Sequence, residues 1–101
     1  MDNHVFDIPQ SRLRDFCHQH HIRKLALFGS VLGPQFRPDS DVDVLVEFEP
    51  GHPVGLIRLA GIERQLSELV GRQVDLRTPA ELSPLFRDDV LRSAEVQYGA
   101  G

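Results

Sequence analysis

Residues 24–48 read KLALFGSVLGPQFRPDSDVDVLVEF, a stretch that contains two predicted strands joined by a turn-rich segment. The run 24–28 is short and apolar and stops at a glycine, which is typical of a buried strand. In 41–48, apolar and polar residues alternate with the period of a half-buried strand. Because residues two apart on a strand share a face, Asp41 and Asp43 are predicted to project from the same side.

Helices and further strands are predicted on both sides of this stretch. The patterns indicate helices over about 11–20, 54–70 and 84–94, and strands over about 73–76 and 96–98. Ser11 is the predicted cap of the first helix, and Gly71 follows the end of the second. Thr78, Pro79 and Glu81 have the spacing of a cap, a proline at the first helical position and a capping-box glutamate.

This order of elements predicts an α+β fold, with a small mixed sheet of three to four strands packed with helices. The helix over 54–70 is long enough to be a crossover, so strands 41–48 and 73–76 are expected to be parallel. The glycine-serine turn after 24–28 and the two aspartates can contact one ligand only if their strand ends are close. Adjacent antiparallel strands would bring those ends together.

The composition is that of one soluble domain spanning residues 1–101. Hydrophobic residues make up 41% and charged residues 26%, values close to the averages of soluble globular proteins. The formal net charge is −4 and the basic residues are scattered, so the sequence does not favour nucleic-acid binding. No apolar run approaches the roughly 18 residues of a membrane helix. The first ten residues lack the basic and apolar regions of a signal peptide, so we expect a cytoplasmic protein without a membrane partner.

Three features of the sequence suggest phosphate and metal chemistry. Gly29 and Ser30 end a predicted strand, where backbone N–H groups can face an anion and a glycine lets a phosphate approach the backbone closely. Asp41 and Asp43 offer hard oxygen ligands of the kind that Mg²⁺ takes together with substrate phosphates. Asp75 is a polar residue within an apolar strand, and it would stand near the pair if that strand lies beside theirs.

These residues carry a resemblance to a known family. The segment GSVLGPQFRPDSDVD contains Gly-Ser, ten residues, and then Asp-x-Asp, which resembles the signature of the DNA-polymerase-β-like nucleotidyltransferase superfamily. The later VDL, residues 74–76, looks like the strand that carries the third carboxylate of that superfamily. The short length and the run SDVDVLVEFEPG are most similar to the minimal nucleotidyltransferases, or MNT proteins. The resemblance spans about residues 20–90 and implies a polymerase-β-like nucleotidyltransferase core.

The resemblance implies a role for each of these residues. Gly29 and Ser30 would hold the β and γ phosphates of a nucleoside triphosphate, with ATP as the expected substrate. Asp41 and Asp43 would bind two Mg²⁺ ions, which clamp the entering and leaving oxygens. Asp75 would share one metal ion and take the proton from an acceptor hydroxyl. The reaction would be an in-line attack on the α-phosphorus, with pyrophosphate as the leaving group.

The resemblance also implies a partner protein, because the chain shows no second domain to bind an acceptor. MNT antitoxins pair with HEPN-domain toxin ribonucleases, so the expected acceptor is a hydroxyl of such a toxin, typically a tyrosine. An apolar patch away from the catalytic residues would hold this partner, and Leu56, Ile57 and Phe86 are candidates for it.

Two alternatives stay open at this point. The chain could be a catalytically silent antitoxin that acts by binding alone, or a transferase acting on a small alcohol or an RNA end. Many MNT relatives carry an arginine in the first few residues after the Gly-Ser pair, whereas this chain has Val-Leu-Gly-Pro at 31–34. The basic residues that could meet the triphosphate instead are Arg37, Arg23, Lys24 and Arg77.

Other reactive side chains favour structural interpretations. His18, His20 and His21 suggest a metal cluster, but a solvated helix end is the favoured interpretation, because cations are stabilised at the negative end of the helix dipole. Cys17 cannot form an internal disulfide as the single cysteine, and it is expected to be a small core residue.

Overall fold

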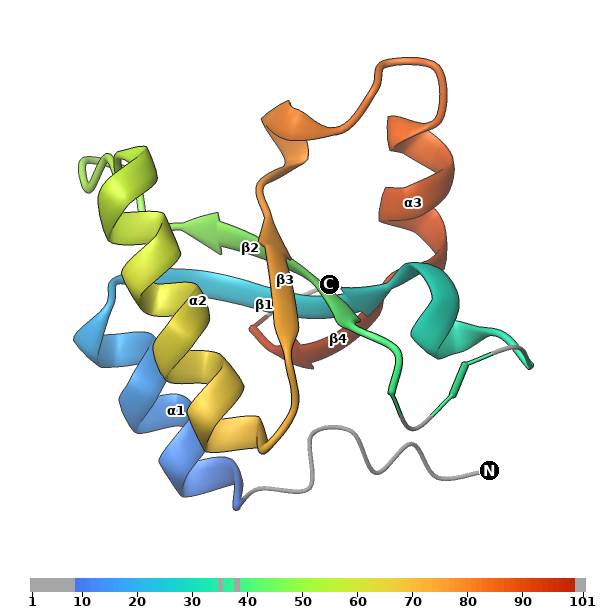
Figure 1. Ribbon diagram of the computed structural model, residues 1–101. Helices are drawn as coiled ribbons and strands as arrows, with labels where there is room; N and C mark the ends of the chain where they lie inside the picture. The colour runs from blue at the N-terminus through green and yellow to red at the C-terminus, as the bar shows by residue number, and fades with distance from the viewer. Residues whose placement is uncertain (1–8, 35, 38, 100–101) are drawn as a thin grey trace.

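The computed structural model describes residues 9–34, 36–37 and 39–99, which form a mixed four-stranded sheet with helices on both faces (Figure 1). The strand order is β3-β2-β1-β4. In chain order the elements are α1 (Gln10–Gln19), β1 (Ile22–Phe28), η2 (Gly29–Leu32), β2 (Val42–Phe48), α2 (Leu56–Val70), β3 (Val74–Arg77), η3 (Pro79–Glu81), α3 (Arg87–Ser93) and β4 (Glu95–Tyr98). The predicted α+β class and mixed sheet are confirmed.

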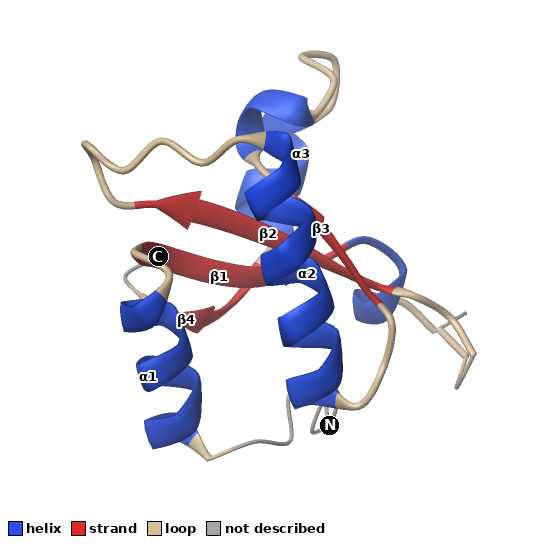
Figure 2. Cartoon of the chain, turned by 60° about the vertical axis from the view of Figure 1, so that its left-hand side comes forward, coloured by secondary structure: helices blue, strands red, loops and turns tan. Residues whose placement is uncertain are grey.

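The pairing of the strands follows the predicted topology. β1 and β2 are adjacent and antiparallel, β2 and β3 are parallel, and β4 pairs antiparallel with the other side of β1. Helix α2 is the crossover between the two parallel strands (Figure 2). The end of β1 and the start of β2 therefore lie together, so one ligand can contact both the glycine-serine turn and the aspartates.

The two faces of the sheet bury different residues because strand side chains alternate. Val42, Val44 and Val46 of β2 are fully buried in the larger core, which includes residues of α1 and α2. A smaller core on the opposite face contains Ala26 and Leu45, packed with residues of α3 among others. Since Asp43 and Asp75 alternate with buried valines and leucines of the larger core, both lie on the α3 face.

Side chains of α2 cover the outer edge of β3. The Val74 N–H donates to Ser67 Oγ at 2.9 Å, and the Leu76 N–H donates to Glu63 Oε2 at 2.8 Å. These bonds occupy backbone donors that an edge strand would otherwise leave open. The register of β3 is thereby held from both sides, and this fixes the position of Asp75.

Two predicted helix starts are wrong. Helix α1 begins at Gln10 rather than at a Ser11 cap, because the Pro9 carbonyl already accepts bonds from the Arg12 and Leu13 N–H groups. The capping box at 78–81 is present, but it opens only the short η3 turn. Helix α3 starts at Arg87, later than predicted, because residues 84–86 form a separate turn in which the Phe86 N–H donates to the Ser83 carbonyl.

The histidines and the cysteine near the end of α1 have different environments. His18 is exposed, as expected. The prediction of a solvated position is wrong for His20, which is 8% exposed, hydrogen-bonds through Nε2 with Gln65 Oε1 at 3.0 Å and contacts the Phe16 ring. Cys17 is fully buried, as predicted, and burial raises the pKa of its thiol to about 12. It is therefore a core residue and not a reactive thiol.

Among the helices of the described residues, none combines the length and the apolar character needed to cross a bilayer.

Candidate active site

Three strands bring the candidate residues into one row. Phe28, the last residue of β1, pairs with Asp43 of β2, and Asp43 in turn stands opposite Asp75 of β3. Directly opposed residues on neighbouring strands have their side chains on the same face and within interaction distance. The two carboxylates that the sequence placed on separate strands are therefore cross-strand neighbours.

Gly29 lies against the first of these carboxylates. Its φ is +76°, in the left-handed region, and a Cβ built on it would lie 2.5 Å from Asp43 Oδ2. The next backbone N–H, that of Ser30, donates a hydrogen bond to the Asp43 carboxylate. A glycine is thus required here both for its backbone conformation and for its lack of a side chain. The predicted glycine-serine turn and Asp43 form one continuous site.

Asp41 comes directly before β2 and is exposed. As the residue two before Asp43 in extended chain, it is placed on the same face. The structure thus puts Asp41, Asp43 and Asp75 at one edge of the sheet, beside the turn at 29–30. All five residues of the predicted site fall in this region.

Arg72 supports the loop that leads into Asp41, and sequence reasoning did not identify it. Its Nη2 donates to the carbonyl of Arg37 at 2.9 Å and to that of Ser40 at 3.2 Å. Its guanidinium also lies over the Phe36 ring, 4.5 Å from the ring centre. The two hydrogen bonds span sequence separations of 35 and 32 residues, so no local motif could have indicated them.

The charges at the site favour a bound cation. Burial raises the pKa of Asp43 above its ordinary value, and the negative charge of Asp75 raises it further, although the Ser30 N–H and Arg77 act in the opposite direction. Arg77 Nη2 donates to Asp75 Oδ2 at 3.2 Å, and this contact raises the pKa of the guanidinium. Close carboxylates with hard oxygen donors are the ligands that Mg²⁺ takes, so the donor set fits a divalent hard cation.

The structure also separates the four basic residues proposed to meet the triphosphate. Arg23 and Lys24 belong to the first half of β1, where both pair with Glu47. Arg37 is exposed in the loop before Asp41. Arg77 alone among the four contacts a candidate carboxylate in the described part of the chain.

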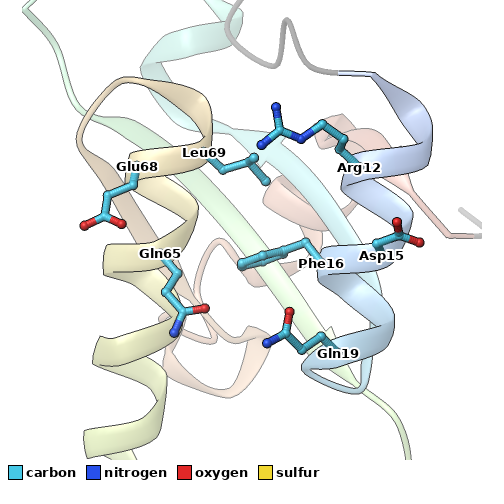
Figure 3. A pocket seen from close by; sticks show the side chains of 7 residues that line it. All are labelled: Arg12, Asp15, Phe16, Gln19, Gln65, Glu68 and Leu69. Carbon is cyan, nitrogen blue, oxygen red and sulfur yellow. The ribbon is translucent and has the colours of Figure 1, made fainter.

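A hollow on the other face of the sheet contains none of these candidate residues. It lies between α1 and α2, has a volume of about 470 Å³, and is open to solvent (Figure 3). Its lining residues are Arg12, Asp15, Phe16, Gln19, Gln65, Glu68 and Leu69. Because α1 and α2 cover the face opposite to Asp43 and Asp75, the carboxylate row and not this hollow is the candidate active site.

A mixed sheet that sets a glycine-serine turn against carboxylates on two strands defines a class of nucleotidyl-transferring enzymes. The nucleotidyltransferase domain family matches residues 11–96, and the chain belongs to this family. It is therefore a nucleotidyltransferase, as the sequence motif predicted.

Known relatives agree with this assignment. Protein adenylyltransferase MntA of Thermococcus cleftensis is 36% identical over 77 residues, which are 76% of this chain and 74% of the relative. A solved structure described as a minimal nucleotidyltransferase is 34% identical, with a TM-score of 0.72. The alignment covers 93% of this chain and 94% of that structure's chain. A chain from a complex of a tri-AMPylated HEPN toxin with an MNT antitoxin of Shewanella oneidensis has the same fold, with a TM-score of 0.63, 17% identity and coverage of 90% and 70%.

Proposed function

We propose that this chain is a Mg²⁺-dependent protein adenylyltransferase that moves AMP from ATP onto a tyrosine hydroxyl of a HEPN-type toxin and so acts as its antitoxin. The observation that carries the proposal is the row in which Asp43 faces Asp75 while Gly29 approaches Asp43 without a side chain. This arrangement provides metal ligands beside a backbone that a phosphate can approach. The relatives, among them a protein adenylyltransferase and a toxin–antitoxin complex, support the choice of substrate and partner.

In this proposal each end of the nucleotide has its own residues. Gly29 and Ser30 bind the β and γ phosphates through the backbone of the turn. Asp41 and Asp43 hold the metal ions that accompany the triphosphate. Two bound Mg²⁺ ions would neutralise the charge that develops on the phosphates and lower the pKa of the acceptor hydroxyl. The carboxylates lie where β1 ends and β2 and β3 begin, so with metal ions bound they would hold the α-phosphate where an acceptor hydroxyl can attack it in line and pyrophosphate can leave.

Asp75 acts on the acceptor side. We assign it to the second metal ion and to the removal of the proton from the acceptor hydroxyl. Arg77, which donates to Asp75, lies beside the carboxylates, and we assign it the place of the arginine that many relatives carry after Gly-Ser. A planar guanidinium suits this task because it binds phosphate through two parallel hydrogen bonds.

The partner would cover exposed apolar side chains. Leu56 and Ile57 at the start of α2 are 79% and 92% exposed, and Leu85 and Phe86 before α3 are 92% and 51% exposed. Adjacent exposed apolar side chains of this size are candidates for a protein interface. The same observation favours a second candidate function, in which the chain neutralises its toxin by binding alone.

Labelled ATP separates these functions. The chain is incubated with a cognate HEPN toxin and ATP labelled at the α-phosphate, and the label is followed onto the toxin. We expect the label on a toxin tyrosine, with loss of labelling when that tyrosine is replaced by phenylalanine. Neutralisation of the toxin without any label would support binding alone. Label appearing on RNA or on a small alcohol, and not on the toxin, would refute the protein substrate.

Metal and nucleotide are expected to stabilise the fold together. A ligand that binds only the native state adds about 2.7 kcal/mol at a hundredfold excess over Kd. We therefore expect Mg²⁺ with a non-hydrolysable ATP analogue to raise the Tm more than the analogue with a chelator. Thermal unfolding with each addition alone provides the controls. Equal shifts with and without the metal would contradict a site in which Mg²⁺ links the carboxylates to the phosphates.

Gly29→Ala is expected to lose nucleotide binding as well as stability. The left-handed backbone costs a residue with a side chain about 1–2 kcal/mol, and the new Cβ would also meet Asp43. Gly51→Ala is the matched control, because Gly51 has a φ of +85° with nothing within 4 Å of its Cβ position. Urea unfolding and calorimetry with the ATP analogue should show a stability loss in both variants and a loss of affinity only in Gly29→Ala. Unchanged affinity in Gly29→Ala would contradict the phosphate role of the turn.

A further inference from the structure

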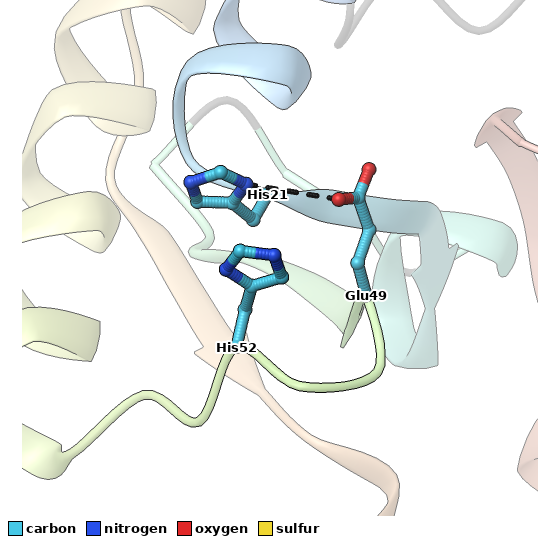
Figure 4. Close-up of side chains that lie close together, drawn as sticks. All are labelled: His21, Glu49 and His52. Atoms are coloured by element: carbon cyan, nitrogen blue, oxygen red, sulfur yellow. Dashed lines mark ion pairs between the residues drawn. The ribbon is translucent and has the colours of Figure 1, made fainter.

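A second group of metal-ligating side chains lies at the other end of the β1–β2 pair. His21, Glu49 and His52 each offer one ligand atom, and these atoms all lie within 4.8 Å of one another (Figure 4). His21 precedes β1 and Glu49 follows β2, whereas the candidate active site stands where β1 ends and β2 begins. The two groups are therefore separated by the length of the strands.

The backbone holds the first two of these residues together. The Glu49 N–H donates to the His21 carbonyl at 2.8 Å, one step beyond the pairing of Ile22 with Phe48. His21 has a φ of +56°, and it is the one residue other than glycine with a positive φ in the described chain. Such a conformation is uncommon for a residue with a side chain and is found preferentially at functional sites. Here it turns the chain from α1 into β1 and presents His21 to Glu49.

A tight turn brings in the third residue. The His52 N–H donates to the Glu49 carbonyl at 3.2 Å, and the two residues between them are Pro50 and Gly51, the latter with a φ of +85°. Proline at the second position and a left-handed glycine at the third are the marks of a type II turn. His52 is thereby folded back over the start of β1, and its ring stacks on that of His21 with centroids 3.8 Å apart and planes 8° from parallel.

The two histidines border open space, and Glu49 lies beside His21 rather than in the wall of that space. Glu49 Oε1 lies 3.7 Å from His21 Nδ1, and both histidines line a hollow of about 200 Å³ at the β2–α2 loop. This volume exceeds that of several water molecules, so an ion and its waters fit. Arg58 also lines the hollow, but its side chain is on an exposed residue, where solvent and salt screen the charge. The neighbouring His20 is hydrogen-bonded to Gln65 and does not belong to the group.

We propose that His21, Glu49 and His52 bind one divalent transition-metal ion of the zinc class, with water at the remaining position. Imidazole nitrogens suit Zn²⁺ and its neighbours, whereas Mg²⁺ prefers oxygen alone, so this site and the aspartate site select different ions. Tetrahedral bonds of about 2.0–2.2 Å bring ligand atoms to roughly 3.4 Å from each other. The ligand atoms, which lie within 4.8 Å of one another, would therefore have to approach more closely. Rotation of the exposed His52 ring out of the stack would shorten these distances without any change in the hydrogen-bonded backbone.

The ion would connect the α1–β1 junction to the β2–α2 loop. His21 belongs to the junction of α1 and β1, and Glu49 and His52 belong to the loop that leads into α2. A metal bound to all three ties the start of this crossover to the sheet and stabilises the native state by an amount that grows with the logarithm of the free metal concentration over Kd. The site takes no part in nucleotidyl transfer, so its test does not depend on the proposed substrate.

The experiment uses the tag-free, chelator-treated chain with Zn²⁺ in calorimetry and Co²⁺ in absorption spectroscopy. The test variants are His52→Ala and His21→Asn, the second chosen because asparagine tolerates a positive φ. The controls are His18→Ala, which removes an exposed histidine outside the group, and Asp43→Asn, which disrupts the aspartate site. We expect one equivalent of Zn²⁺ to bind with a micromolar or lower Kd, and Co²⁺ to give the visible bands of a four- or five-coordinate ion.

Each test variant is expected to weaken Zn²⁺ binding at least about tenfold, which is ~1.4 kcal/mol, while both controls bind as the wild type does. The ring nitrogens of His21 and His52, followed by NMR, should shift on addition of Zn²⁺. No Zn²⁺ binding by the wild type at millimolar concentration would overturn the proposal. So would undiminished binding by both test variants, or loss of binding in Asp43→Asn alone.

Discussion

Asp43→Asn is expected to abolish nucleotidyl transfer and at the same time to make the metal-free protein more stable at neutral pH. In the proposed mechanism the carboxylate holds metal and triphosphate, and such charge stabilisation contributes several kcal/mol, so we expect a loss of about 10³-fold or more. Without metal, the same carboxylate is partly buried and faces the negative charge of Asp75, and both effects raise its pKa. Asparagine keeps the shape, still accepts a bond from the Ser30 N–H, and has no charge to repel.

The pH dependence of this gain has a definite sign. In the unfolded chain Asp43 titrates near the ordinary value of about 3.9, and in the folded chain it titrates higher. A raised folded pKa stabilises the protein below the unfolded pKa, and this contribution is lost as pH rises through the folded pKa. The variant should therefore exceed the wild type in stability most at neutral pH, and the difference should disappear below about pH 3.9.

Urea unfolding in the presence of a chelator, from pH 3 to pH 7, checks the stability, and single-turnover transfer checks the activity. Asp15→Asn is the matched control, because Asp15 is exposed on α1, which packs on the opposite face of the sheet. It should leave transfer unchanged. Wild-type transfer by Asp43→Asn would refute the assignment of the site. A metal-free variant that is less stable than the wild type at pH 7 would refute the electrostatic account of Asp43.

Asp75→Asn is expected to separate binding from chemistry. If Asp75 serves the acceptor side, the variant binds Mg²⁺ and the ATP analogue nearly as well as the wild type but transfers at least about 100-fold more slowly, within the range of a lost general base. Asp75 lies on a different strand from Asp41 and Asp43, and its carboxylate side chain is 35% exposed, so an acceptor can approach it. Calorimetry with the analogue and single-turnover transfer to the toxin are measured side by side, with Asp43→Asn for comparison.

The pattern of losses distinguishes three roles for Asp75. A loss confined to transfer supports the base and the acceptor-side metal. A parallel loss of affinity and transfer makes Asp75 an ordinary metal ligand for the triphosphate and refutes the division of labour. Unchanged affinity and transfer would mean that the β3 strand does not line the site. The double variant Asp75→Asn with Arg77→Gln then tests whether the Arg77 contact had masked the effect, since it removes both members of that pair.

Much of the fold could be predicted because local patterns reflect the elements they form. The alternation of valines in 42–46 predicted which side of β2 faces the larger core, and the length of the helix before Gly71 predicted a parallel crossover. The short spacing of Asp41 and Asp43 on one strand predicted their shared face. The starts of α1 and α3 were less predictable, because backbone groups of Pro9 and the Ser83–Pro84 pair decide them.

The sequence therefore determined the class of fold and indicated the five candidate site residues, since periodicity and short spacings act within one element. Only the tertiary structure decided which residues from distant segments meet. Asp43 faces Asp75 through strand pairing, Arg72 reaches back to the loop before Asp41, and His21 meets Glu49 and His52 through a backbone bond and a turn. Contacts of this kind arise when the chain is packed, and no periodicity along the sequence records them, because they depend on how whole strands and helices are placed against each other.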